Sequence, residues 1–97
     1  MLVNIIMELD EGLVLASYVK ISKYRWNVMG TLYENRFLMP SEIANRTGIL
    51  NNHISFVLKQ LKNKGLIECI NPEVRKGRLY RLTDTGMEVM SVFIKEI

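Results

Sequence analysis

The sequence predicts a mainly helical α+β fold in which two short helices are followed by a β-hairpin. Residues 50–64 place apolar side chains on one face at helical spacing, which indicates an amphipathic helix. After Gly65 the pattern changes to the β-type runs LIECI and RLYRL, which flank the turn-rich segment NPEVRKG. Apolar helical patterns on both sides of this unit predict flanking helices towards the two chain ends.

The length and composition predict one globular domain. The 97 residues are enough for a single hydrophobic core, so we expect residues 1–97 to form one unit. With 48% hydrophobic and 24% charged residues, the composition is ordinary for a globular protein. No apolar run approaches the roughly 18 to 20 residues of a spanning helix, and the chain lacks the basic start of a signal peptide. We therefore expect a cytoplasmic protein without a membrane segment.

The residue types that carry metal and redox chemistry are almost absent. Cys69 is the only cysteine and His53 the only histidine, which excludes an intrachain disulfide and a closed Cys/His zinc site. We interpret Cys69 as a small apolar strand residue in preference to a reactive thiol. No phosphate-binding loop is present, and no nucleophile, base and acid converge on neighbouring elements. We expect no metal, no cofactor and no enzymatic activity.

Positive charge is concentrated in the middle of the chain. The formal net charge is +3, but residues 20–81 hold twelve of the thirteen basic residues against four acids, a net charge of +8. A field of this sign attracts a polyanion, and nucleic acid is the commonest polyanion in the cytoplasm. Charge alone fits a merely solvated surface equally well.

The N-terminal part of the chain predicts two helices. Residues 10–21 begin with acids, which suit a helix N-terminus, and continue mostly apolar. Ser22 is suited to cap a second helix that runs to about Asn35. Residues 1–9 (MLVNIIMEL) precede both as an extension that is apolar enough to need a partner surface.

The middle of the chain predicts a brief strand and two helices joined by a short turn. Residues 37–39 are too few for a helix and lead into Pro40, which suits the first position of a helix. Gly48 ends this helix, because glycine adopts a left-handed conformation most easily. The next helix spans residues 50–64, and its apolar face consists of Ile54, Val57, Leu58 and Leu61.

The C-terminal part predicts a hairpin and a last helix. Strands are expected within residues 66–70 and 78–82, and Gly77 allows a tight turn at the basic tip. Thr83 is suited to cap the final helix. Residues 40–64 then form a helix-turn-helix and residues 66–82 a wing. The whole is a winged helix-turn-helix with a small β-hairpin wing and flanking N- and C-terminal helices.

The second helix of a helix-turn-helix lies in the DNA major groove, and a basic hairpin beside it reaches the flanking phosphates. The face opposite the apolar stripe of residues 50–64 carries side chains suited to base edges. The candidate base-reading residues are Asn51, Asn52, Ser55, Phe56 and Lys59. The candidate DNA-backbone contacts are Ser41, Lys62, Arg75, Lys76 and Arg78.

Several of these residues have an alternative structural interpretation. Asn51 and Asn52 are equally suited to cap the helix, and Phe56 is suited to pack under the wing or against a protein partner. For His53 we expect a hydrogen-bonded structural role. Arg81 is expected to pair with Glu68 across the hairpin.

The run TGILNNHISFVLKQLKNKGLIECINPEVRKGRLYRLTDTG resembles the recognition helix and wing of archaeal winged-helix transcriptional regulators, relatives of the MarR and ArsR families. The resemblance extends back through SKYR and PSEIA and covers most of residues 10–90. It implies a dimeric DNA-binding regulator, usually a repressor, with the residues named above at the groove and in the wing. The chain departs from the pattern at Phe56, where a basic or small polar residue is frequent. It also lacks the paired cysteines of the ArsR branch, so no inducer is implied.

The sequence therefore predicts a sequence-specific double-stranded DNA-binding transcriptional regulator, with a protein-interaction module of a transcription or replication assembly as the alternative. We expect a homodimer formed by residues 1–21 and 83–97, because the two chain ends carry more apolar surface than one core contact needs. The alternative is a monomer in which residues 1–9 fold back over the final helix. The candidate dimerisation residues are Leu2, Ile5, Ile6, Leu9, Met90, Phe93, Ile94 and Ile97.

Overall fold

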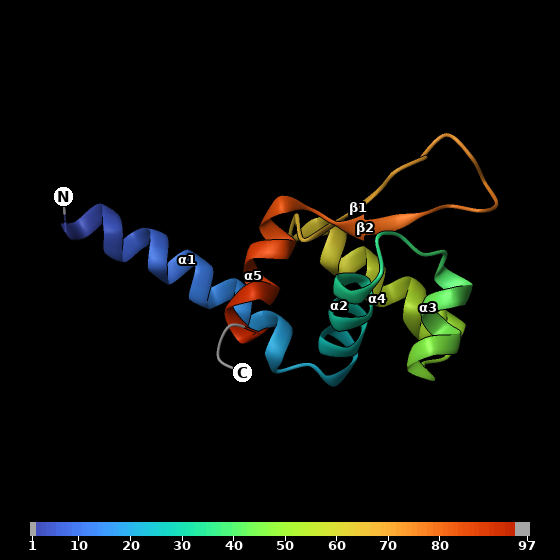
Figure 1. Cartoon of the computed structure of the whole chain (residues 1–97), viewed down its shortest axis with the longest axis horizontal. Helices are drawn as coiled ribbons and strands as arrows, with labels where there is room; N and C mark the ends of the chain where they lie inside the picture. The colour runs from blue at the N-terminus through green and yellow to red at the C-terminus, as the bar shows by residue number, and fades with distance from the viewer. Residues whose placement is uncertain (1, 95–97) are drawn as a thin grey trace.

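The computed structural model describes residues 2–94 of the chain, and their side chains from residue 11 onward. This region consists of five helices and a two-stranded antiparallel hairpin (Figure 1). The helices are α1 (Leu2–Lys20), α2 (Lys23–Glu34), α3 (Pro40–Thr47), α4 (Asn51–Asn63) and α5 (Asp84–Ile94), and the strands are β1 (Ile67–Cys69) and β2 (Tyr80–Leu82). The predicted mainly helical α+β winged fold is confirmed.

The hydrophobic core is arranged around α2, which contacts each of the other four helices and β2. Val28, Met29 and Leu32 form the buried side of α2. The other helices and the hairpin each add one or more apolar side chains to this centre. The core residues outside α2 are Ala16, Val19, Leu38, Ile43, Ala44, Ile49, Ile54, Val57, Leu58, Leu61, Leu66, Ile67, Leu82, Val89 and Met90.

Four of the predicted helix ends are confirmed by their capping geometry. Ser22 accepts a 3.2 Å hydrogen bond from the backbone N–H three residues later, and Thr83 does the same at the start of α5 with a 3.1 Å bond. Pro40 occupies the first turn of α3. Gly48 ends that helix with φ of 77°, in the left-handed region that glycine tolerates best.

The N-terminal helix differs from the prediction. α1 begins at Leu2 and not near residue 10, so Asp10 and Glu11 lie inside the helix. Residues 2–9 contain neither Gly nor Pro, so nothing in this segment interrupts the helix. The first half of α1 projects away from the body of the molecule (Figure 1). Residues 2–9 therefore do not fold back over the final helix, contrary to the alternative expectation.

The β structure is smaller than predicted. The segment at residues 37–39 contributes a single bridge between Leu38 and Tyr80, with N···O distances of 3.0 and 2.9 Å. β1 and β2 pair over three residues each, in the register that places Glu68 opposite Arg81. No helix in the described part of the chain is long and apolar enough to cross a membrane.

Candidate nucleic-acid interface

The helix-turn-helix is formed by α3 and α4, which pack against each other across the turn at Gly48. The buried side of α4 consists of the four residues predicted for it, Ile54, Val57, Leu58 and Leu61. The opposite side is open to solvent and carries every predicted base-reading residue, namely Asn51, Asn52, Ser55, Phe56 and Lys59. Lys62 and, in the first turn of α3, Ser41 are also exposed.

The start of α4 tests the interpretation of the two asparagines as capping residues. Leu50 is the N-cap residue, and no side-chain hydrogen bond caps the helix. Asn51 and Asn52 lie in the first turn with their amides exposed. The capping interpretation is therefore wrong. The Ser55 hydroxyl already forms a hydrogen bond within α4, because it donates to the Asn51 carbonyl oxygen at 3.3 Å.

The first turn of α2 lies beside α4, which the sequence did not predict. The rings of Tyr24 and His53 are 5.4 Å apart, both on the exposed surface. Arg25 donates a 2.8 Å hydrogen bond to the Tyr18 carbonyl oxygen and reaches Gln60 of α4 at 3.5 Å. His53 thus packs against an aromatic ring, and its side chain makes no hydrogen bond with the described residues, so the expected hydrogen-bonded role is wrong. The SKYR motif was the available signal for this contact.

The wing is a loop held by its own side chains. The Asn71 carboxamide accepts a 2.8 Å hydrogen bond from the Leu79 N–H and donates a 3.1 Å bond to the Gly77 carbonyl oxygen. The Arg78 guanidinium donates to the carbonyl oxygens of Val74, at 2.7 Å, and Pro72, at 3.2 Å. These hydrogen bonds join residues 71–74 to residues 77–79 and hold the loop in one shape.

The cations of the wing differ in their surroundings. Arg75 and Lys76 are exposed and make no hydrogen bond or ion pair with the described part of the chain. Arg78 is exposed too, but two of its donors are used inside the loop, a role that the sequence did not predict. Gly77 has φ of 75°, which allows the chain to turn beside these cations. The wing therefore presents Arg75 and Lys76 from a braced loop.

The predicted pair across the hairpin is confirmed. Arg81 Nε lies 2.8 Å from Glu68 Oε2, and both side chains are about half exposed. An exposed pair of this kind contributes little to stability. Cys69 is half-buried within β1, as expected for a small strand residue.

Of the predicted dimerisation residues, Met90, Phe93 and Ile94 have described side chains, and these differ in exposure. Met90 is only 2% exposed and belongs to the core of its own chain, so it is not available to a partner. Phe93 is half-buried and meets Trp26 edge to face, with ring centroids 4.9 Å apart. Ile94 is exposed. The side chains of Leu2, Ile5, Ile6 and Leu9, and the whole of Ile97, lie outside the described residues.

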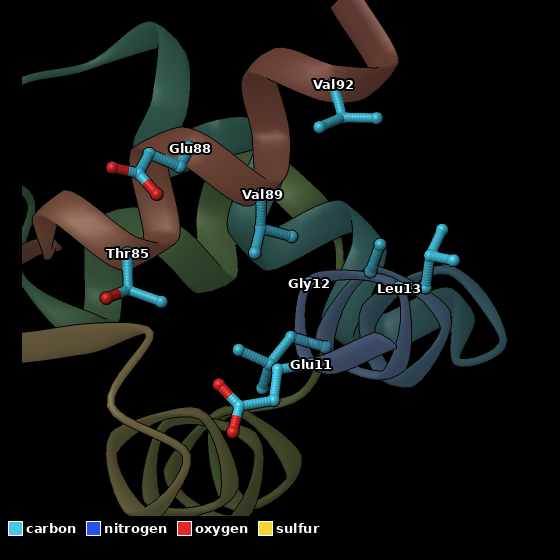
Figure 2. A pocket seen from close by; sticks show the side chains of 9 residues that line it. Glu11, Gly12, Leu13, Thr85, Glu88, Val89 and Val92 are labelled. Carbon is cyan, nitrogen blue, oxygen red and sulfur yellow. The ribbon is translucent and has the colours of Figure 1, made fainter. Parts of the chain in front are cut away.

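A groove of about 430 Å³ lies between α1 and α5 (Figure 2). Its apolar lining includes Leu13, which is 61% exposed, and Val92, which is 52% exposed. Glu11 and Glu88 supply acidic groups along the same groove. Val14, the next residue of α1, is also exposed. The sequence did not single out these residues, although they lie within helices that it predicted, because the packing of α1 against α5 is not visible in local spacing.

The helix-turn-helix followed directly by a hairpin defines a winged-helix fold. Among solved structures, NadR in complex with 4-hydroxyphenylacetate is 21% identical, and the match covers 97% of this chain and 70% of NadR with a TM-score of 0.71. NMB1585, a MarR family regulator from Neisseria meningitidis, is 23% identical over 97% of this chain and 66% of its own, with a TM-score of 0.72. TubR bound to 24 bp of tubC from Bacillus thuringiensis serovar israelensis pBtoxis is 14% identical over 89% of this chain and 95% of TubR, with a TM-score of 0.77.

These likenesses show that the chain has the winged-helix fold of MarR family regulators. No protein-family model and no curated protein matches the sequence. The archaeal origin and the ArsR-like relation stay predictions.

Proposed function

We propose that this protein is a sequence-specific double-stranded DNA-binding transcriptional regulator that acts as a repressor. The observation that carries the proposal is the placement of an exposed polar face on α4 together with the exposed wing cations Arg75 and Lys76. A helix placed in the major groove leaves a neighbouring hairpin within reach of the flanking phosphates. The concentration of positive charge in residues 20–81 favours the same partner.

In this proposal the residues divide into two groups by what they contact. Residues that read base edges lie on α4, and residues that bind phosphate lie on α3, at the end of α4 and in the wing. The base-reading group is Asn51, Asn52, Ser55, Phe56 and Lys59, and the phosphate group is Ser41, Lys62, Arg75, Lys76 and Arg78. The TubR structure, which holds 24 bp of DNA, supports the proposal as a protein of similar fold.

We further propose that the protein is a homodimer whose interface includes the groove between α1 and α5. Exposed Leu13 and Val92 line this groove, and the first half of α1 extends beyond the body of the molecule (Figure 1). Half-sites one helical turn apart require two recognition helices about 34 Å apart, and a two-fold symmetric dimer is the arrangement that such sites match.

A second function is supported by one observation. Phe56 is 63% exposed on the face assigned to DNA, and exposed aromatic rings often mark protein interfaces. A protein-interaction module of a transcription or replication assembly would use the same face of α4. Such an interaction module would not require the exposed wing cations Arg75 and Lys76.

Salt-dependent binding of a labelled duplex separates the two functions. Because bound cations release counterions from DNA, the affinity should fall by orders of magnitude between about 50 and 200 mM salt. Arg75→Gln should lower the slope of log affinity against log salt by about one. Lys20→Gln is the matched control, since Lys20 lies over Trp26 and Phe93 and not on the face of α4. Absence of duplex binding at the lower salt contradicts the DNA function.

A further inference from the structure

We propose that the half-site read by α4 has an A·T core, in which Asn52 pairs with an adenine and Phe56 contacts a thymine methyl group. The inference rests on the proposed DNA-binding function and names its substrate class. It starts from the two side chains at the centre of the exposed face of α4, which lie four residues apart and therefore one above the other.

Asn52 has the chemistry for adenine and an amide that is available. With Leu50 as the N-cap residue, the Asn52 carboxamide makes no hydrogen bond within the described residues. One amide group offers a donor and an acceptor side by side, and adenine N7 and N6 present the complementary pair in the major groove. Guanine presents two acceptors there, so the amide oxygen would be left without a partner.

The Phe56 ring favours contact with thymine and disfavours contact with a G·C pair. Its ring is 63% exposed and cannot form a hydrogen bond with a base edge. The thymine methyl group is the apolar feature of the major groove, so contact with it buries two apolar surfaces together. The same ring against a G·C pair would remove water from the polar groups of guanine or cytosine without replacing their hydrogen bonds.

The composition of α4 points in the same direction. Its sequence NNHISFVLKQLKN contains no arginine, the usual reader of guanine, and no carboxylate to accept from cytosine. Lys59, which can also contact guanine, lies on the same exposed face about one turn beyond Phe56. Because it follows Asn52 and Phe56 along the helix, we place any guanine contact beside the A·T core.

Base analogues test the two contacts without changing the protein. A half-site is first selected from a random duplex pool by the full chain at low salt, and its enriched core should consist of A·T pairs. Replacing the contacted thymine by uracil removes only the methyl group and should weaken binding about fourfold, the worth of one buried methyl. Replacing the contacted adenine by 7-deazaadenine removes the N7 acceptor and should cost roughly fivefold to a hundredfold.

Each analogue is combined with the matching variant. Phe56→Ala should bind the uracil and thymine duplexes equally, and Asn52→Ala should no longer distinguish 7-deazaadenine from adenine. Asn63→Ala, an exposed asparagine at the other end of α4, is the control and should keep both discriminations. Enrichment of G·C pairs in the core overturns the inference, and so does a uracil effect that persists in Phe56→Ala. Duplex binding without these discriminations leaves the proposed function intact, whereas no duplex binding overturns both.

Discussion

Arg75 and Arg78 lie three residues apart in the wing, and the structure gives them different roles. The Arg75 side chain extends without a partner in the described chain, whereas Arg78 bridges the carbonyl oxygens of Val74 and Pro72. A guanidinium reaches two acceptors because its donors form a planar fork, and a lysine ammonium at the same position does not reproduce this geometry. Arg78 thus positions the wing in addition to carrying a charge.

Arg78→Lys is expected to weaken duplex binding about three- to tenfold although the charge is unchanged, because the loop that presents Arg75 loses its brace. Arg75→Lys should stay close to the wild-type affinity, since it keeps the cation. Arg75→Ala should cost less in the Arg78→Lys background than in the wild type, which fluorescence anisotropy with one labelled duplex measures. Wild-type affinity for Arg78→Lys would show that only the charge of this residue matters.

At the scale of the element, the start of α5 is held close to the loop that precedes β1. Gly86 lies in the first turn of α5, and a Cβ atom added there would collide with the Leu66 carbonyl oxygen. The same carbonyl accepts a 3.0 Å hydrogen bond from the Thr83 N–H. The backbone of α5 at Gly86 lies directly against the backbone carbonyl of Leu66. The clash with an added Cβ atom therefore cannot be relieved by rotation of a side chain.

Gly86→Ala is therefore expected to lower the free energy of unfolding by about 1 to 3 kcal/mol. Gly30→Ala is the matched control in α2, where no atom lies within 4 Å of the added Cβ. This control should raise the free energy of unfolding by about 0.5 to 1 kcal/mol, because alanine is the better helix former. Urea unfolding followed by circular dichroism measures both. A stable Gly86→Ala variant would mean that α5 can shift away from β1.

The sequence predicted those elements whose signals are local. The apolar stripe of α4 follows from helical spacing, and Ser22, Pro40, Gly48 and Thr83 mark helix ends by their own backbone and capping chemistry. The braces of the wing could not be predicted, because Asn71 and Arg78 reach their acceptors only in one loop conformation. The burial of Met90 was missed for a similar reason, since it depends on how α5 is rotated against α2.

At the scale of the whole molecule, the second half of α1 packs into the core through Ala16 and Val19, whereas its first half extends away from the body (Figure 1). The described region measures 47 Å along its longest axis against 29 and 20 Å along the others, and α1 accounts for the extension (Figure 1). A helical segment as short as the first half of α1 is only marginally stable in water by itself, so further contacts would stabilise it. The apolar groove beside it, between α1 and α5, is the surface on which a second copy would supply those contacts (Figure 2).

If this surface is the dimer interface, Val92→Glu should separate the chains. The carboxylate would be buried against apolar side chains of the partner without a counter-ion, and Glu11 and Glu88 in the groove would add repulsion. Sedimentation equilibrium at micromolar concentration should show the wild type at twice the 11.3 kDa chain mass and the variant at the mass of one chain. The dimer dissociation constant should rise by more than about a hundredfold.

Ile70→Glu is the control for Val92→Glu. Ile70 is an exposed apolar residue of the wing, so its substitution should leave the dimer intact. Deleting residues 1–9 should weaken the dimer as well, which would extend the interface along α1. A wild type that sediments as one chain would contradict the dimer, and a dimeric Val92→Glu variant would place its interface elsewhere.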